Sequence, residues 1–98
     1  MKFMITWQFH PGKLHEGLAF FSRMTPEQDA ADRGDRIKLI GRWHDLGRGR
    51  GVAICESDSA EAMAAWALNW NAIMDCDIAM VLDDAETRAL GKKRARKK

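Results

Sequence analysis

The sequence predicts an α+β fold of the ferredoxin-like kind, in which the elements follow the order strand, helix, strand, strand, helix, strand. Four segments alternate apolar and polar side chains, which is the period of a half-buried strand. Two other segments repeat apolar side chains at helical spacing. The chain has 98 residues, 46% of them hydrophobic, which suffices for one core. We therefore expect a βαββαβ domain with a four-stranded antiparallel sheet.

Residues 2–9 form the first predicted strand, because every second side chain is large and apolar: Phe3, Ile5, Trp7 and Phe9. The His-Pro-Gly sequence that follows ends this strand. Residues 13–24 predict the first helix, with apolar side chains close to helical spacing: Leu14, Leu18, Phe21 and Met24. A short polar helix is expected over residues 26–33, because Thr25 suits the N-cap and Gln28 suits the reciprocal position of a capping box.

Strands two and three are predicted over residues 36–45 and 52–56, joined by a loop rich in glycine and arginine. In strand two, alternation places Trp43 on the face that the helices cover and His44 on the other face. A bulge near Gly41 would exchange the two. The face of each side chain in this strand therefore depends on whether its alternation is interrupted.

The second main helix is expected to begin after Asp58 or Ser59, because either residue can serve as the N-cap. Its apolar stripe consists of Met63, Trp66, Ala67 and Trp70. Residues 76–82 alternate and form the fourth predicted strand. A final helical turn is expected from residue 83 or 84 to Leu90.

Charge is distributed unevenly along the chain. Residues 1–90 hold ten basic and fourteen acidic side chains, whereas residues 91–98 hold six basic ones and no acid. We therefore divide the chain into a single domain and a basic, disordered tail. The acidic body argues against a fold that itself presents a positive face to nucleic acid. The tail is suited either to weak, non-specific nucleic-acid binding or to a purely solubilising role. Its cations are Lys92, Lys93, Arg94, Arg96, Lys97 and Lys98.

Targeting and redox features indicate a cytoplasmic protein. The early apolar stretch is too short for a signal-peptide core, and no run reaches the roughly 18 apolar residues of a membrane span. Cys55 and Cys76 form neither a CxxC pair nor a zinc-ligand pattern. They fall on predicted strands that another strand separates, about 10 Å apart, which prevents a disulfide. We expect no membrane partner, no metal site and no cofactor.

Two helices cover only one side of the predicted sheet and leave the second side without a partner in the same chain. By alternation this side carries a largely apolar set: Met4, Thr6, Ile40, His44, Ala53, Cys55, Ala79 and Val81. A face of this composition is rarely left in contact with water. We expect a second copy to cover it, so that the eight strands of a two-fold homodimer close into a dimeric α+β barrel.

A cluster of tryptophans and one asparagine is the first candidate site. Trp66 and Trp70 are four residues apart and share a helix face, which Asn69 borders. These side chains could line a flat pocket between helix and sheet, with the asparagine orienting a carbonyl or hydroxyl of a small aromatic ligand. Packing of the core explains the tryptophans equally well. The residues assigned to this pocket are Trp7, Trp43, Trp66, Asn69 and Trp70.

His44 is the candidate catalytic residue, because an imidazole titrates near neutral pH and can move a proton. The alternative is a structural histidine that hydrogen-bonds to Arg42, Glu56 or a group of the partner chain. No second residue at metal-ligand spacing accompanies His44, and we assign no metal site to it.

Four phrases of the sequence resemble a bacterial family of domains of unknown function: residues 10–13 (HPGK), 40–46 (IGRWHDL), 51–54 (GVAI) and 65–71 (AWALNWN). The likeness extends to about Leu90. It implies the fold of the dimeric α+β barrel group, which includes cofactor-independent and haem-degrading monooxygenases, isomerases and plain binding modules. The site of the haem-degrading members resembles a set of strand asparagine, helix tryptophan and helix histidine, where this chain offers Gln8 and His15. The resemblance therefore implies a fold, but neither a reaction nor a haem ligand.

Two main classes of function stay open. In the first, the chain is a small-molecule-binding homodimer. In the second, it is a cofactor-independent monooxygenase- or isomerase-type enzyme, in which His44 moves a proton and the indoles hold a small aromatic or hydrophobic substrate. Weak nucleic-acid binding through the tail is a third, separate hypothesis.

Overall fold

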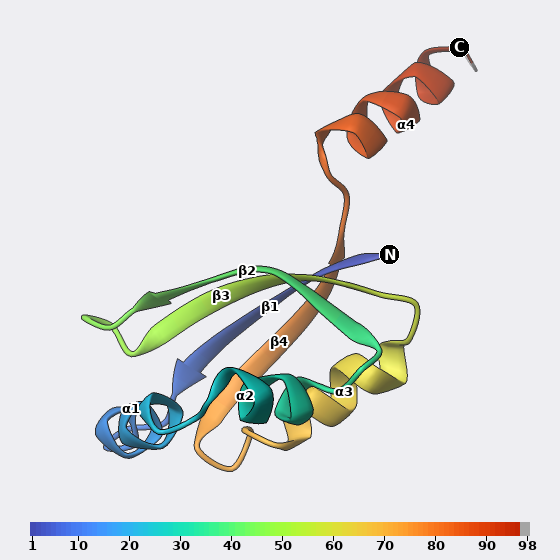
Figure 1. The fold of residues 1–98 in the computed structure, drawn as a ribbon. Helices are drawn as coiled ribbons and strands as arrows, with labels where there is room; N and C mark the ends of the chain where they lie inside the picture. The colour runs from blue at the N-terminus through green and yellow to red at the C-terminus, as the bar shows by residue number, and fades with distance from the viewer. Residues whose placement is uncertain (97–98) are drawn as a thin grey trace.

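Four antiparallel strands form one sheet in the computed structural model of the chain, which describes residues 1–96 (Figure 1). The strands are β1 (Lys2–Phe9), β2 (Ile37–Asp45), β3 (Arg50–Ser57) and β4 (Met74–Val81). Their order across the sheet is β2-β3-β1-β4, so β1 lies between β3 and β4 as predicted. This order confirms the ferredoxin-like arrangement of an α+β fold.

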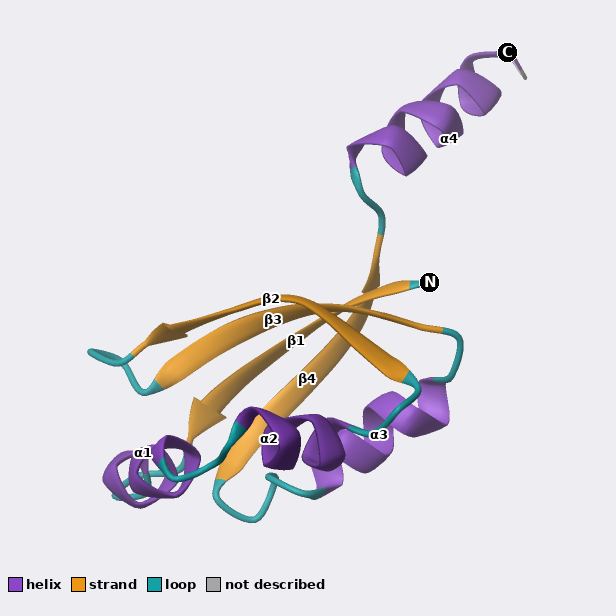
Figure 2. Cartoon of the chain, viewed as in Figure 1, coloured by secondary structure: helices purple, strands orange, loops and turns teal. Residues whose placement is uncertain are grey.

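Three helices lie on one side of the sheet, and a fourth points away from it (Figures 1 and 2). They are α1 (Leu14–Ser22), α2 (Pro26–Arg33), α3 (Ala60–Leu68) and α4 (Asp84–Arg96). Helix α2 begins with the predicted capping box, in which Thr25 and Gln28 exchange hydrogen bonds, and Ser59 caps α3. The second side of the sheet carries no helix of the described chain, and we call it the open face.

The core lies between the helix-covered face of the sheet and α3. Phe3 and Ile5 of β1 stand opposite Cys55 and Ala53 of β3, and all four are buried together with Met63 of α3. The prediction that Ala53 and Cys55 lie on the uncovered face is therefore wrong. The Val-Ala-Ile-Cys run of β3 is apolar at every position, so alternation alone cannot choose between its two faces.

A β-bulge in β2 decides which face each later side chain of this strand occupies. The pairing of β2 with β3 shifts by one residue between Leu39 and Gly41, which makes Ile40 the extra residue. Beyond the bulge, His44 lies on the helix-covered face and Trp43 on the open face, with 61% of Trp43 exposed. Strict alternation predicts Trp43 under the helices and His44 on the opposite face, and both predictions are wrong. The bulge exchanges the faces of these two side chains.

The open face carries the alternate side chains of all four strands. Cross-strand partners share a face, so pairs such as Met4 with Ile54 and Trp43 with Val52 define it. Its apolar members are Met4, Trp43, Val52, Ile54, Ala79 and Val81. The prediction is thus confirmed for Met4, Thr6, Ala79 and Val81.

Helix α4 extends away from the domain and is longer than predicted. It continues to Arg96 instead of ending at Leu90, and none of its side chains is buried. Lys2 of β1 contacts the N-terminal end of α4 through ion pairs with Asp83 at 3.3 Å and Glu86 at 3.4 Å. No helix within residues 1–96 is both long enough and apolar enough to cross a membrane.

Candidate functional site

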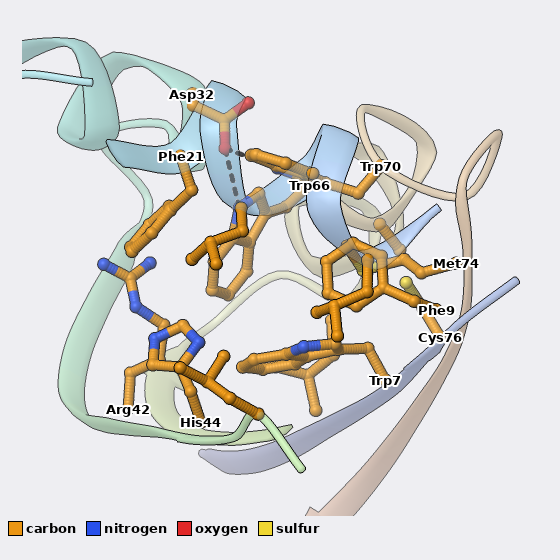
Figure 3. A pocket seen from close by; sticks show the side chains of 16 residues that line it. Trp7, Phe9, Phe21, Asp32, Arg42, His44, Trp66, Trp70, Met74 and Cys76 are labelled. Carbon is orange, nitrogen blue, oxygen red and sulfur yellow. Dashed lines mark hydrogen bonds between the residues drawn. The ribbon is translucent and has the colours of Figure 1, made fainter. Parts of the chain in front are cut away.

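A cavity of about 70 Å³ opens between the sheet and the helices α1 and α3, and we call it the helix-side cavity (Figure 3). Five aromatic rings line it: Trp7, Phe9, Phe21, Trp66 and Trp70. Alternation in β1 directs Trp7 and Phe9 toward the helices. Gly17 lets α1 approach the sheet closely, because a Cβ at this position would overlap the ring of Phe9. The local sequence thus builds a flat, largely apolar chamber.

The volume of the helix-side cavity limits what it can hold. A water molecule needs on the order of 10 to 15 Å³, so a cavity of about 70 Å³ accommodates about five waters. At roughly 30 Å³ of liquid volume each, five waters occupy about as much space as one benzene-sized ring. The enclosed part of the cavity therefore has room for a single aromatic ring.

Asp32, near the end of α2, holds the polar edges of two of the rings. Its Oδ2 accepts hydrogen bonds from Nε1 of Trp66 at 3.1 Å and from Nε1 of Trp70 at 2.7 Å (Figure 3). Its Oδ1 accepts a third bond, from Nδ2 of Asn69 at 3.1 Å. A buried indole N–H needs an acceptor, and this one carboxylate supplies it to both rings. The orientation of both indoles is therefore fixed before any ligand enters.

Sequence reasoning misses Asp32 as a member of the site. The sequence indicates only that Trp66 and Trp70, four residues apart, need an acceptor for their indole N–H groups. It does not indicate which of the fourteen acidic residues supplies that acceptor. Asn69, which was expected to orient a ligand, does not line the helix-side cavity. Its amide instead donates to the side chain and to the backbone oxygen of Asp32.

Arg42 lines the cavity from β2 as one half of a largely buried ion pair. Its Nη1 and Nη2 donate to the two oxygens of Asp29 at 3.1 and 2.8 Å, and Arg33 donates to the same carboxylate at 3.0 Å. Burial alone would raise the pKa of Asp29, but the bonds from Arg42 and Arg33 outweigh it and hold that pKa below its usual value. The Arg42 guanidinium also lies 4.8 Å from the centre of the Phe21 ring, within cation–π distance.

His44 stands between two aromatic rings at the edge of the cavity. Its imidazole lies 5.5 Å from the Trp7 ring and 5.2 Å from the Phe21 ring, centre to centre. Partial burial lowers the pKa of His44 below its ordinary value, and the positive charge of Arg42 lowers it further. The ring is therefore neutral at pH 7, with one nitrogen as donor and the other as acceptor. Neither nitrogen is hydrogen-bonded to a group of residues 1–96.

Gly51 of β3 makes the contact between Trp7 and His44 possible. Gly51 lies opposite Trp7 of β1 on one side and opposite His44 of β2 on the other. Because it has no side chain, nothing separates the two rings. A Cβ on Gly51 would overlap the indole of Trp7 and would stand 2.7 Å from the backbone oxygen of Trp43. The close approach of these groups therefore requires glycine at this position.

Cys76 lines the same cavity but is not suited to be a nucleophile. Burial raises the pKa of this thiol, and the charges of Asp75 and Asp77 raise it further. A protonated thiol is a weak nucleophile. Cys55 is also a free thiol, and the two cysteines lie on strands that β1 separates, as predicted.

The structure brings together four of the predicted site residues and separates the others. Trp7, His44, Trp66 and Trp70 line the helix-side cavity (Figure 3). The assignment of Trp43 to this cavity is wrong, because the bulge in β2 turns its side chain to the open face.

The cations assigned to polyanion binding lie on a separate element. Lys92, Lys93, Arg94 and Arg96 belong to α4, which points away from the sheet, whereas Lys97 and Lys98 lie outside the described residues. Across the part of the chain that the structure describes, no three His, Cys, Asp or Glu side chains are placed to share a metal ion.

Comparison with known proteins identifies a family. Among curated proteins, none matches the sequence. One similar solved structure is that of an uncharacterised NIPSNAP domain protein from Burkholderia xenovorans, with 17% identity, a TM-score of 0.45, and 85% of this chain and 95% of that chain covered. Residues 1–95 match the family described as domain of unknown function DUF3303, so the likeness reaches beyond the expected limit at Leu90. Because this match spans nearly the whole chain, the protein belongs to the DUF3303 family.

Proposed function

We propose that this protein binds a small, flat and mostly apolar molecule in the helix-side cavity. The observation that carries the proposal is the arrangement of five aromatic rings around an opening of about 70 Å³. Sites for small molecules are typically concave and apolar, with a few polar groups that orient the ligand. Here the ionisable groups that line the cavity are Asp32, Arg42, His44 and the Cys76 thiol.

The walls of the cavity are held in place without a ligand, which also supports the proposal. Asp32 accepts hydrogen bonds from the indole N–H groups of Trp66 and Trp70, and Asp29 forms a bidentate ion pair with Arg42. Binding to a site that is already ordered loses less side-chain entropy than binding to a mobile one. A preformed aromatic chamber is therefore suited to bind even a small ligand.

The indole N–H signals in a ¹H–¹⁵N spectrum test this proposal, because the tryptophans report on both faces of the sheet. Titration with toluene or p-cresol is expected to shift the signals of Trp7, Trp66 and Trp70. Trp43 lies on the opposite face and serves as an internal control. Unchanged spectra with both compounds, or equal shifts at all tryptophans, would contradict the proposal.

We also propose that two copies form a homodimer by packing their open faces together. Trp43 on this face is 61% exposed, and Ile40 at the neighbouring bulge is 51% exposed. Several exposed apolar side chains of this size are seldom left in water by a soluble domain. A two-fold axis lets one patch cover its own copy, while the helix-side cavity stays accessible on the other face.

Light scattering at micromolar concentration tests the dimer. The expected mass is twice that of the chain, and Trp43→Asp is expected to give the monomer, because it places a charge in the apolar surface that the two copies would bury. Trp43→Phe is the matched control and should remain dimeric. A monomeric mass for the unmodified protein would overturn this part of the proposal.

A second candidate function is enzymatic, and the position of His44 favours it. A neutral imidazole at the exposed edge of an apolar cavity can accept a proton from a bound substrate, as a general base does. The reaction would be an isomerisation, or a cofactor-independent oxygenation that starts with the same proton removal.

Exchange of the α-hydrogens of cyclohexanone for deuterium in D₂O, followed by NMR, tests whether His44 removes protons. Exchange is expected to be faster with the unmodified protein than with His44→Phe, whereas cyclohexanone should shift the Trp66 indole signal in both. Equal exchange rates would exclude His44 as a base for this probe.

A further inference from the structure

The two charged groups that line the helix-side cavity within residues 1–96 are already engaged in hydrogen bonds. Arg42 is the one guanidinium that lines it within residues 1–96, and both of its terminal nitrogens bind Asp29. Asp32 is the one carboxylate that lines it in the same part of the chain, and three N–H groups bind its oxygens. An anionic ligand would therefore compete with Asp29 for Arg42 and would face the negative charge of Asp32.

His44 differs from these two groups because its ring nitrogens have no hydrogen-bond partner among the described residues. Contacts with the rings of Trp7 and Phe21 hold the imidazole at the cavity wall. A neutral imidazole offers one donor and one acceptor nitrogen, so it can bond to either a hydroxyl or a carbonyl group. The cavity thus combines aromatic walls with an imidazole at its exposed edge, whose nitrogens can bond to a ligand.

We propose that the ligand is a neutral single-ring molecule with one hydroxyl or carbonyl group, and that His44 binds this polar group. The proposal rests on the ligand-binding function proposed above and names the chemical class of the ligand. The ring of the ligand packs against the indoles of Trp7 and Trp66, while its polar atom meets the imidazole. A carboxylate or phosphate on the same ring weakens binding, because Arg42 is already bound to Asp29 and the carboxylate of Asp32 repels a second negative charge.

Three probes of nearly the same shape test this class, with dissociation constants read from the Trp66 indole signal at about pH 7.5. Toluene carries no polar group, p-cresol adds a hydroxyl, and 4-methylbenzoate adds a negative charge. We expect p-cresol to bind about two- to tenfold more tightly than toluene, which is the usual effect of one hydrogen bond. We expect 4-methylbenzoate to bind at least about tenfold more weakly than toluene.

Variants of His44 separate the hydrogen bond from the packing of the ring. His44→Phe keeps a flat ring beside Trp7 but removes both nitrogens, so p-cresol should bind no better than toluene. Toluene binding should be unchanged, which shows that the variant is folded. His44→Gln restores a donor and an acceptor and should recover part of the preference, and His15→Phe, at an exposed position on α1, should keep all of it.

The outcomes distinguish this inference from the function on which it rests. If no probe shifts the Trp66 signal, the ligand-binding proposal itself is overturned. If toluene binds as tightly as p-cresol, or if the preference survives in His44→Phe, the cavity is a site for apolar rings and His44 has no role in choosing the ligand. If 4-methylbenzoate binds most tightly, the assignment of a neutral ligand is overturned.

Discussion

Trp7 and Trp43 both pack against glycines, but they lie on opposite faces of the same sheet. The Trp7 indole packs against Gly51 beneath the helices, and the Trp43 indole packs against Gly41 on the open face. Trp7 forms a wall of the helix-side cavity, whereas Trp43 is 61% exposed. The two contacts are locally alike, so the difference shows that the elements covering a face decide whether such a ring becomes part of a pocket or part of an external surface.

Removal of the carboxylate that orders the helix-covered face is expected to have the largest effect on stability. Asp32→Ala leaves the indole N–H groups of Trp66 and Trp70 without their acceptor, at a cost of about 2 to 4 kcal/mol in the free energy of unfolding. Urea denaturation measures this loss. Asp35→Ala is the control, because Asp35 is exposed, and it should change stability by less than about 0.5 kcal/mol. Equal values for the two variants would show that Asp32 does not stabilise the indoles.

The same substitution at the two glycines compares the two faces directly. Gly51→Ala forces a methyl group against Trp7 and against a backbone oxygen, and should cost about 1 to 3 kcal/mol. Gly41→Ala meets only the indole of Trp43, which is exposed and can turn away, so its cost should stay below about 1 kcal/mol. The urea midpoints of the two variants measure these costs. A larger loss of stability in Gly41→Ala than in Gly51→Ala would contradict the prediction.

His44 makes the stability of the helix-covered face depend on pH. Its pKa in the folded protein lies below the ordinary value of 6.5, so the unfolded chain binds a proton more readily. Stability contributed by the neutral ring is present above pH 6.5 and is lost as the pH falls below that value toward the folded pKa. Urea midpoints at about pH 7.5 and about pH 5.5 should therefore differ less for His44→Phe than for the unmodified protein.

The exposed His15 provides the control for this experiment. His15→Phe should keep the pH dependence of the unmodified protein, because its side chain does not line the cavity. If His44→Phe also keeps that dependence in full, another group is responsible for it.

Helix α4 covers neither face, and loss of its C-terminal half is expected to have the smallest effect on stability. Deletion of residues 91–98 should change the free energy of unfolding by less than about 0.5 kcal/mol, because the last turns of α4 bury no side chain. Any binding of a single-stranded oligonucleotide should be weak, should fall as salt rises, and should disappear with the deletion. Binding that persists in the truncated protein would place the site on the domain instead of the tail. Fluorescence anisotropy at two salt concentrations measures it.

The order of the strands and helices could be predicted because each element carries a local pattern. Alternation identifies β1, and the pairing of Thr25 with Gln28 marks the start of α2. The faces of β2 beyond residue 40 could not be predicted, because an inserted residue in a strand has no hydrophobic signature of its own. Asp32 could not be predicted as the acceptor for Trp70, because the contact joins residues 38 positions apart and depends on how α2 packs against α3.

The bulge at Ile40 links the chemistry of the two faces to the way in which β2 pairs with β3. If the strand kept Ile40 but paired with β3 without the bulge, strict alternation would turn Trp43 toward the helices and move His44 and Arg42 to the outside. The cavity would lose its imidazole and its guanidinium in the same event that removes the exposed indole from the opposite surface. Loss of the bulge without shortening of the strand would therefore change the proposed ligand choice and the proposed self-association together, because one pairing shift places His44 and Trp43 on their opposite faces.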